Sequence, residues 1–183
     1  MVTLIAVIFL VVFGSKAAIF PLYYWLPQSY TEPPAAVSAL FGGLLTKVGV
    51  YCLIRTYTLM FVGDNQYTHT ILLVLGIATM VLGGLGAIAQ YNYKRILSYH
   101  IISQVGYMIM GLALGTVTAV AAAIYFMIHN IVVKSSLFLF EGVTEKITGT
   151  PELKQMGGLL HRYPLLGWGF FLGGISVAGV PPV

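Results

Sequence analysis

The sequence has 183 residues, of which 58% are hydrophobic and 8% are charged, whereas an ordinary soluble domain has about 25% charged residues. With a mean hydropathy of +0.92, the chain has too few polar side chains to cover a surface in water. This excludes a soluble globular domain and predicts that lipid surrounds much of the chain. The net charge of +4 comes from basic residues that are spread between apolar stretches and form no patch, so no nucleic-acid partner is expected. Cys52 is the single cysteine, which excludes an intrachain disulfide and a CxxC site.

Apolar stretches long enough to cross a bilayer nearly fill the chain, since a spanning helix needs about 20 residues. The sequence predicts an all-α, polytopic membrane protein with about six such helices. Gly14 and Pro21 interrupt the first stretch, which is therefore expected to be a broken helix. The chain begins inside an apolar stretch and is still apolar at its end, so we expect a fragment, 1–183, of one longer membrane domain. The approximate spans are 1–26 (broken), 35–57, 70–89, 96–114, 117–143 and 165–183 (truncated).

The charges of the connecting loops predict the orientation in the membrane. The connections after the first, third and fifth stretches lie on one face and carry most of the basic loop residues. By the positive-inside rule this face is cytoplasmic, which places loops 90–95 and 144–164 inside and loop 62–69 outside. A multi-pass protein of a bacterial or archaeal cytoplasmic membrane is expected.

Three lysines fall inside the predicted spans: Lys16, Lys47 and Lys134. A lysine at the centre of a spanning helix costs about 2.5–3.5 kcal/mol on insertion scales, so each needs a partner, a water-filled cavity or a task. Lys16 lies beside the predicted helix break, and such breaks mark ion sites in transporters. The alternative for Lys16 is that it extends to a membrane interface, which is harder for Lys47 because it lies about twelve residues from either end of its span.

The fifth stretch combines His129 with Lys134. Histidine and desolvated lysine are side chains that exchange protons near neutral pH. Their spacing of five residues separates them by about 140° on a regular helix. A π-bulge between them would bring them to one face, and we predict one there. The alternative is that His129 only satisfies a neighbouring polar group.

The fourth stretch has a polar stripe in which His100, Ser103, Gln104 and Tyr107 recur at helical spacing, so they share one face. This stripe could carry water or could join helices by hydrogen bonds. The glycines of segment 83–86, like the Gly111–Gly115 pair, favour close helix packing over phosphate binding. The sequence contains no motif for a metal, a cofactor or catalysis, so we expect a protein that is not an enzyme.

Several stretches resemble the antiporter-like subunits that respiratory complex I and the Mrp cation/proton antiporters share. They are KAAIFPLYYWLP (16–27), PAAVSAL (34–40), LTKVGVY (45–51), KRILSY (94–99) and SQVGY (103–107). The match covers nearly the whole chain. The forms KAAIFPLYYWLP, FGGLLTKVGVY (41–51) and SYHIISQ (98–104) are most similar to the D-type branch of the Mrp proteins, including its relatives in membrane-bound hydrogenases.

The resemblance implies a five-helix repeat paired with an inverted copy, and it implies roles for the lysines. Lys16 would sit at the break of a discontinuous helix and pair with a glutamate of an earlier helix outside this sequence. Lys47 would be a second central lysine, and Lys134 with His129 would match the central-axis lysine and histidine. A charged residue of the second broken helix would follow Val183.

The implied function is a membrane subunit of a multisubunit Na⁺ (or K⁺)/H⁺ antiporter, with other membrane subunits as partners. Protons would move through the buried lysines, the histidines and water chains. The alternative is a proton-pumping subunit of a redox complex, either complex I or a membrane-bound hydrogenase. A third interpretation is a helix-packing scaffold in which all three lysines are structural.

Overall fold

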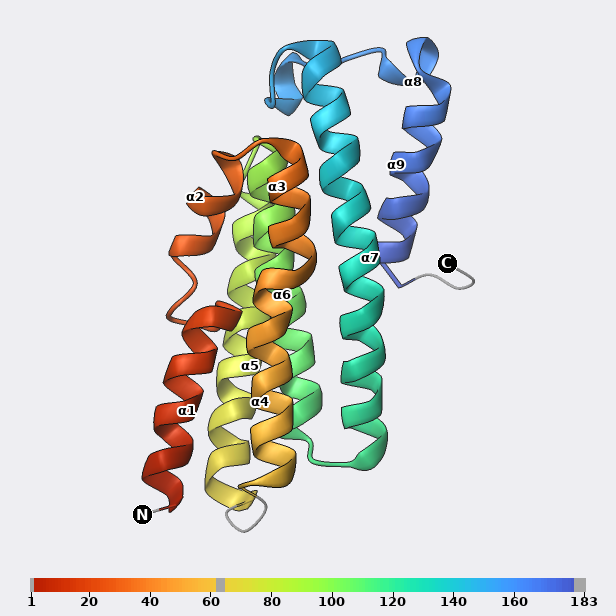
Figure 1. Cartoon of the computed structure of the whole chain (residues 1–183). Helices are drawn as coiled ribbons and strands as arrows, with labels where there is room; N and C mark the ends of the chain where they lie inside the picture. Colours follow the sequence, from red (N-terminus) through yellow and green to blue (C-terminus); the bar gives the residue numbers. More distant parts are fainter. Residues whose placement is uncertain (1, 62–64, 180–183) are drawn as a thin grey trace.

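The computed structural model describes residues 2–61 and 65–179, and their regular structure is helical apart from one bridge between Asn92 and Glu152. Figure 1 shows long helices running side by side, with the chain rising and falling through the molecule. Four helical spans in the described residues are long and apolar enough to cross a membrane, and two shorter apolar helices flank them. The predicted fold class, an all-α polytopic membrane protein with a discontinuous helix, is confirmed.

The first apolar stretch is two helices, α1 (Val2–Ala17) and α2 (Trp25–Thr31). The break falls between Gly14 and Pro21, at Ala18, whose φ of 63° ends α1. Side chains satisfy backbone groups near the break: Thr79 Oγ1 accepts a hydrogen bond from the Phe20 amide at 2.9 Å, and Trp25 Nε1 donates to the Ser15 carbonyl at 2.9 Å. An interrupted helix can therefore exist at membrane depth without unpaired backbone groups at these positions. In Figure 1, α2 continues above α1.

The second span is continuous but changes pitch. It consists of α3 (Ala35–Leu40), a π-helical turn η1 (Phe41–Leu45) and α4 (Thr46–Leu59). A π-turn holds one residue more than an α-turn, so it rotates the side chains that follow it relative to a regular helix. Lys47 is the second residue after this turn.

The third, fourth and fifth spans are α5 (Asn65–Ile88), α6 (Tyr93–Ala113) and α7 (Val117–Thr148). Local sequence fixes two starts: Asn92 caps α6 by accepting from the Arg95 amide at 3.2 Å, and Thr116 caps α7 by accepting from the Ala119 amide at 3.2 Å. These caps occupy amides that a helix start leaves unpaired. Gly149, with φ 75°, ends α7.

The chain then turns through η2 (Leu153–Gln155) and α8 (Leu159–Arg162) into α9 (Pro164–Val177), which lies beside α7 (Figure 1). The connections before α6 and after α7 meet at one end. Lys94 Nζ lies 2.8 Å from Glu145 Oε2, and the Tyr93 amide donates to the Pro151 carbonyl at 3.0 Å. At the opposite end His69 Nδ1 lies 2.9 Å from the Ala113 carbonyl oxygen. The predicted grouping of the loops on two faces fits this arrangement, although residues 62–64 of loop 62–69 lie outside the described residues.

The helices pack closely where glycines face backbone. A Cβ at Gly83 would lie 2.5 Å from the Ser103 amide nitrogen, and a Cβ at Gly106 would lie 2.5 Å from the Met80 amide nitrogen. α5 and α6 therefore touch along their backbones, as the predicted packing role of segment 83–86 requires. Many large apolar side chains stay exposed on the outer faces, among them Leu4, Val74 and Val132. Such faces suit lipid as the surrounding solvent.

Candidate functional site

Lys134 is the centre of the candidate site. Its side chain is fully buried, and its Nζ has no hydrogen-bond partner among the residues that the structure describes. It lies midway along α7 and lines a cavity of about 610 Å³ between α6, α7 and α9. A buried ammonium in such a place is costly unless it faces water or serves a task. The cavity is large enough to hold several waters, since each takes about 30 Å³ in the liquid.

The polar stripe of α6 faces the same cavity, whose lining includes all four of its predicted members. Ser103 is held in place, because its Oγ donates to the Met80 carbonyl at 3.0 Å. Gln104 is buried, and its Oε1 has no hydrogen-bond partner within the described part of the chain. The structure thus brings Lys134 together with His100, Ser103, Gln104 and Tyr107.

Lys47 lies in a different environment, beside the π-turn. Its side chain is 3% exposed, and its Nζ donates a hydrogen bond of 2.6 Å to the Gly42 carbonyl oxygen. The turn also brings this segment against α7, because a Cβ at Gly43 would collide with the Ser135 hydroxyl. Ser135 follows Lys134 directly, so the two buried lysines lie on segments in close contact.

Lys16 stands apart from these two residues. It lies in the last turn of α1, where the helix breaks, but its side chain is exposed in this chain. It therefore lies at the predicted break and outside the cavity around Lys134.

The predicted π-bulge between His129 and Lys134 is wrong. α7 is α-helical from Val117 to Thr148, so the two side chains diverge by about 140°. His129 Nε2 lies 2.8 Å from the Ser176 hydroxyl of α9, and its ring stacks on Phe126. Because α9 supplies a polar group on that side, no distortion of α7 is needed to satisfy the histidine. The π-helical turn that the structure does contain precedes Lys47.

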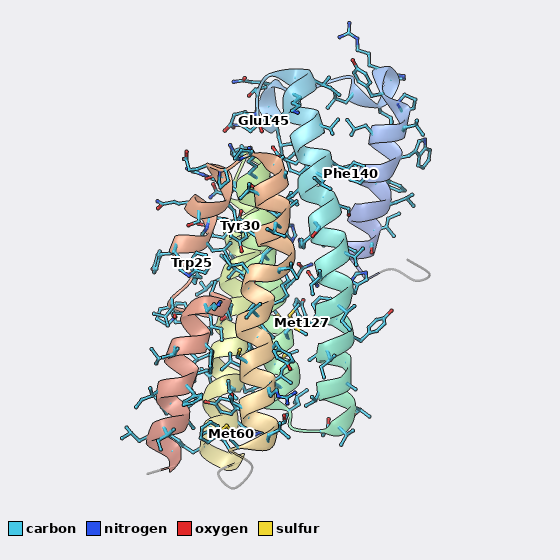
Figure 2. All side chains as sticks on the ribbon, in the orientation of Figure 1. Trp25, Tyr30, Met60, Met127, Phe140 and Glu145 are labelled. Atoms are coloured by element: carbon cyan, nitrogen blue, oxygen red, sulfur yellow. The ribbon has the colours of Figure 1, made fainter. Side chains whose placement is uncertain are left out.

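Sequence reasoning missed one buried charge, Glu141. Its side chain is fully buried, and both carboxylate oxygens have no hydrogen-bond partner among the described residues. It follows Lys134 by seven residues on the same uninterrupted helix, which places both on one face. That spacing is the signal that could have identified it. The labels of Phe140 and Glu145 in Figure 2 mark the part of α7 that contains Glu141, and Phe140 packs against α9.

These features define a class of protein: a polytopic helical membrane protein with a broken helix, two buried lysines, and a cavity that one of them, Lys134, lines together with the polar stripe of α6. Among the described residues no group of three or more metal-ligating side chains occurs. The transmembrane family of NADH:quinone oxidoreductases and Mrp antiporters matches residues 1–183. The chain belongs to this family.

Two curated relatives give a finer comparison. The chain is 61% identical over 179 residues to the D-type subunit of the Na⁺/H⁺ antiporter of Alkalihalophilus pseudofirmus, a match that covers 98% of this chain and 36% of the relative. It is 48% identical over 183 residues to the corresponding Na⁺/H⁺ antiporter protein of Bacillus subtilis, covering 100% of this chain and 37% of that protein. The chain thus spans little more than a third of the length of these relatives.

Two solved structures share the fold. A chain of the Mrp complex from Dietzia sp. superposes with a TM-score of 0.94 at 36% identity, over 98% of this chain and 34% of that one. A chain of a membrane-bound sulfane sulfur reductase, an archaeal respiratory complex, gives a TM-score of 0.86 at 30% identity, over 92% of this chain and 35% of that one.

Proposed function

We propose that this chain is part of a D-type membrane subunit of a multisubunit monovalent cation/proton antiporter. Na⁺ or K⁺ moves against protons, and the complex includes other membrane subunits in the cell membrane. In this account the chain is a transporter segment and not an enzyme. The antiporter names of the relatives at 61% and 48% identity support this proposal.

The observation that carries the proposal is the surroundings of Lys134. Its amine is buried without a hydrogen-bond partner in the described chain, and it faces a cavity that the polar stripe of α6 also lines. Lysine amines in apolar surroundings serve as proton donors and acceptors in proteins. A purely structural lysine at this depth would be expected to have a polar partner.

The residues take the following roles. Lys134 binds and releases the proton, and His100, Ser103, Gln104 and Tyr107 hold the water chain that leads to it. Lys47 is the next carrier, across the contact between η1 and α7. Lys16 acts at the helix break, with Gly14 and Pro21 on either side of it, and His129 orients α9 through Ser176.

The test separates an antiporter from a redox-driven pump. The full-length parent complex is purified and reconstituted in proteoliposomes that contain a pH-sensitive dye and no electron donor. A pH gradient is imposed, and Na⁺ or K⁺ is then added. The proposal expects the added cation to collapse the gradient without any donor, and comparison of the two cations identifies the substrate.

If protons moved only after an electron donor was supplied, the proposal would be overturned in favour of a proton-pumping subunit of a redox complex. The test includes the redox-driven pump because this chain shares its fold with a chain of a respiratory complex.

A further inference from the structure

Glu141 is a buried charge that the roles assigned above do not use. On α7 it lies two turns beyond Lys134, which corresponds to about 10 Å along the helix axis. Its side chain is fully buried, and neither carboxylate oxygen has a hydrogen-bond partner in the described part of the chain. An ionised carboxylate buried without partners costs several kcal/mol. A role in helix packing alone would not require a charged side chain at this position.

The groups around Glu141 are titratable on one side and apolar on another. Lys94 of α6 and Glu145 of α7 act on it electrostatically, and Glu141 in turn acts on Tyr93 of α6. From α3, Ala35 packs against the neighbouring Gly142. From α9, Phe170 contacts the Tyr93 ring. The polar neighbours of Glu141 therefore come from the ends of α6 and α7 where the connections before α6 and after α7 meet.

These neighbours join the cavity to the exterior of the chain. Tyr93 lines the cavity that contains Lys134, and its buried hydroxyl has no hydrogen-bond partner among the described residues. Lys94 is paired with Glu145 at 2.8 Å, and the Glu145 side chain is 35% exposed. Glu145 lies near the end of α7 in Figure 2. Polar groups thus run from the partly exposed Glu145 carboxylate, past Glu141 and Tyr93, to the cavity.

We propose that Glu141 is a proton-binding site that connects this end of the molecule with Lys134. This inference rests on the proposed function, because it assigns the route by which protons reach Lys134. The Glu141 carboxyl gives its proton to the Tyr93 hydroxyl, which passes its own proton to water in the cavity that it lines, so Glu141 becomes a carboxylate and Tyr93 stays neutral. The water chain passes a proton to the neutral Lys134 amine, which becomes an ammonium. A proton from the side of the Lys94–Glu145 pair then restores the carboxyl. The same steps in reverse release protons.

The first test compares two variants of the full-length parent complex in everted vesicles. Glu141→Gln keeps the size of the side chain and removes its acidity. We expect the rate of cation/proton exchange to fall by a factor of about 100, the lower end of what a positioned proton donor contributes. Glu152→Gln is the matched control, because it removes a carboxylate from the loop at the same end. It is expected to exchange at the wild-type rate, and assembly is checked on native gels.

A second measurement detects the proton itself. Infrared difference spectra of the purified complex between acidic and alkaline pH are expected to contain the carbonyl stretch of a protonated carboxyl that Glu141→Gln lacks. If Glu141→Gln did not assemble, Glu141→Asp would be used instead. It keeps the acid on a shorter side chain and is expected to exchange slowly, with an altered pH profile.

The outcomes separate this inference from the proposed function. Wild-type exchange in an assembled Glu141→Gln complex, or a pH profile unchanged in Glu141→Asp, would overturn the role of Glu141 alone. Exchange that is lost in Glu141→Gln but not in Glu152→Gln, together with the missing carboxyl band, would support it. If Lys134→Ala left exchange intact, the proposed function would fail whatever the behaviour of Glu141.

Discussion

The three lysines within the membrane domain lie in three different environments. Lys134 is buried with no hydrogen-bond partner in the described chain, Lys47 is buried against a backbone carbonyl, and Lys16 is exposed. Hydropathy alone identified all three as unusual, because a charge in an apolar stretch is visible in the sequence. Their differences were not predictable, since burial depends on which neighbouring helix covers each side chain.

Lys16 offers a mutation that separates function from folding. Because its side chain is exposed in this chain, Lys16→Ala removes no buried contact here, and the full-length complex is expected to assemble normally. Exchange measured with a pH-sensitive dye in everted vesicles should nevertheless be abolished, because the lysine lies at the helix break.

Arg55→Ala is a suitable control for Lys16, since it removes an exposed cation near the end of α4. It should leave exchange close to the wild-type rate. Full activity in an assembled Lys16→Ala complex would remove Lys16 from the proposed pathway.

At the scale of elements, the sequence predicted a helical chain with a broken first helix, but it placed the π-turn in the wrong helix. Asn92, Thr116 and Gly149 are local signals for helix ends. The expected spans 96–114 and 117–143 nevertheless leave out the first residues of α6 and the last residues of α7. The position of the π-turn cannot be read from such local signals. The spacing of His129 and Lys134 indicated a bulge only if both needed the same side of α7. Ser176, which lies 47 residues further along the chain, satisfies His129 on the other side.

The close contact of α5 and α6 yields a paired prediction. In Gly83→Ala the new methyl group would lie 2.5 Å from the Ser103 backbone nitrogen, so the helices must separate, at a cost of about 1–3 kcal/mol. In Gly84→Ala the nearest atom is the Ser103 hydroxyl at 3.9 Å, and alanine favours a helix over glycine by about 1 kcal/mol. Gly83→Ala should therefore lower the melting temperature of the purified complex, while Gly84→Ala should leave it unchanged or raise it. Equal melting temperatures of the two variants would contradict this account of the packing.

At the scale of the whole molecule, the site forms where side chains of α6, α7 and α9 meet. The stripe of α6 was predicted as a stripe, but its position opposite Lys134 depends on how α6, α7 and α9 pack together. The surroundings of Glu141 were not predictable for the same reason, because the packing of α6 against α7 decides that Tyr93 and Lys94 lie near it. Helical periodicity assigns residues to faces, and tertiary packing decides which faces meet.

The orientation of the chain in the membrane is a further prediction at this scale. Charge asymmetry places the end with Lys94 and Glu145 in the cytoplasm. A cysteine at Tyr67, in the first turns of α5 and 60% exposed, should react with an impermeant thiol reagent added from outside, in a Cys52→Ser background. A cysteine at Gln155, which is exposed at the opposite end, should react only after permeabilisation. The reverse labelling pattern would invert the assignment.

The central claim is that Lys134 carries protons for cation exchange, and Lys134→Ala tests it most directly. The full-length complex is assayed in everted vesicles with a pH-sensitive dye on addition of Na⁺ or K⁺. Lys146→Ala, which removes an exposed lysine from the last turn of the same helix, serves as the matched control. We expect an assembled Lys134→Ala complex to lose exchange by a factor of about 100 or more, while Lys146→Ala keeps it. Exchange at the wild-type rate in an assembled Lys134→Ala complex would contradict the account.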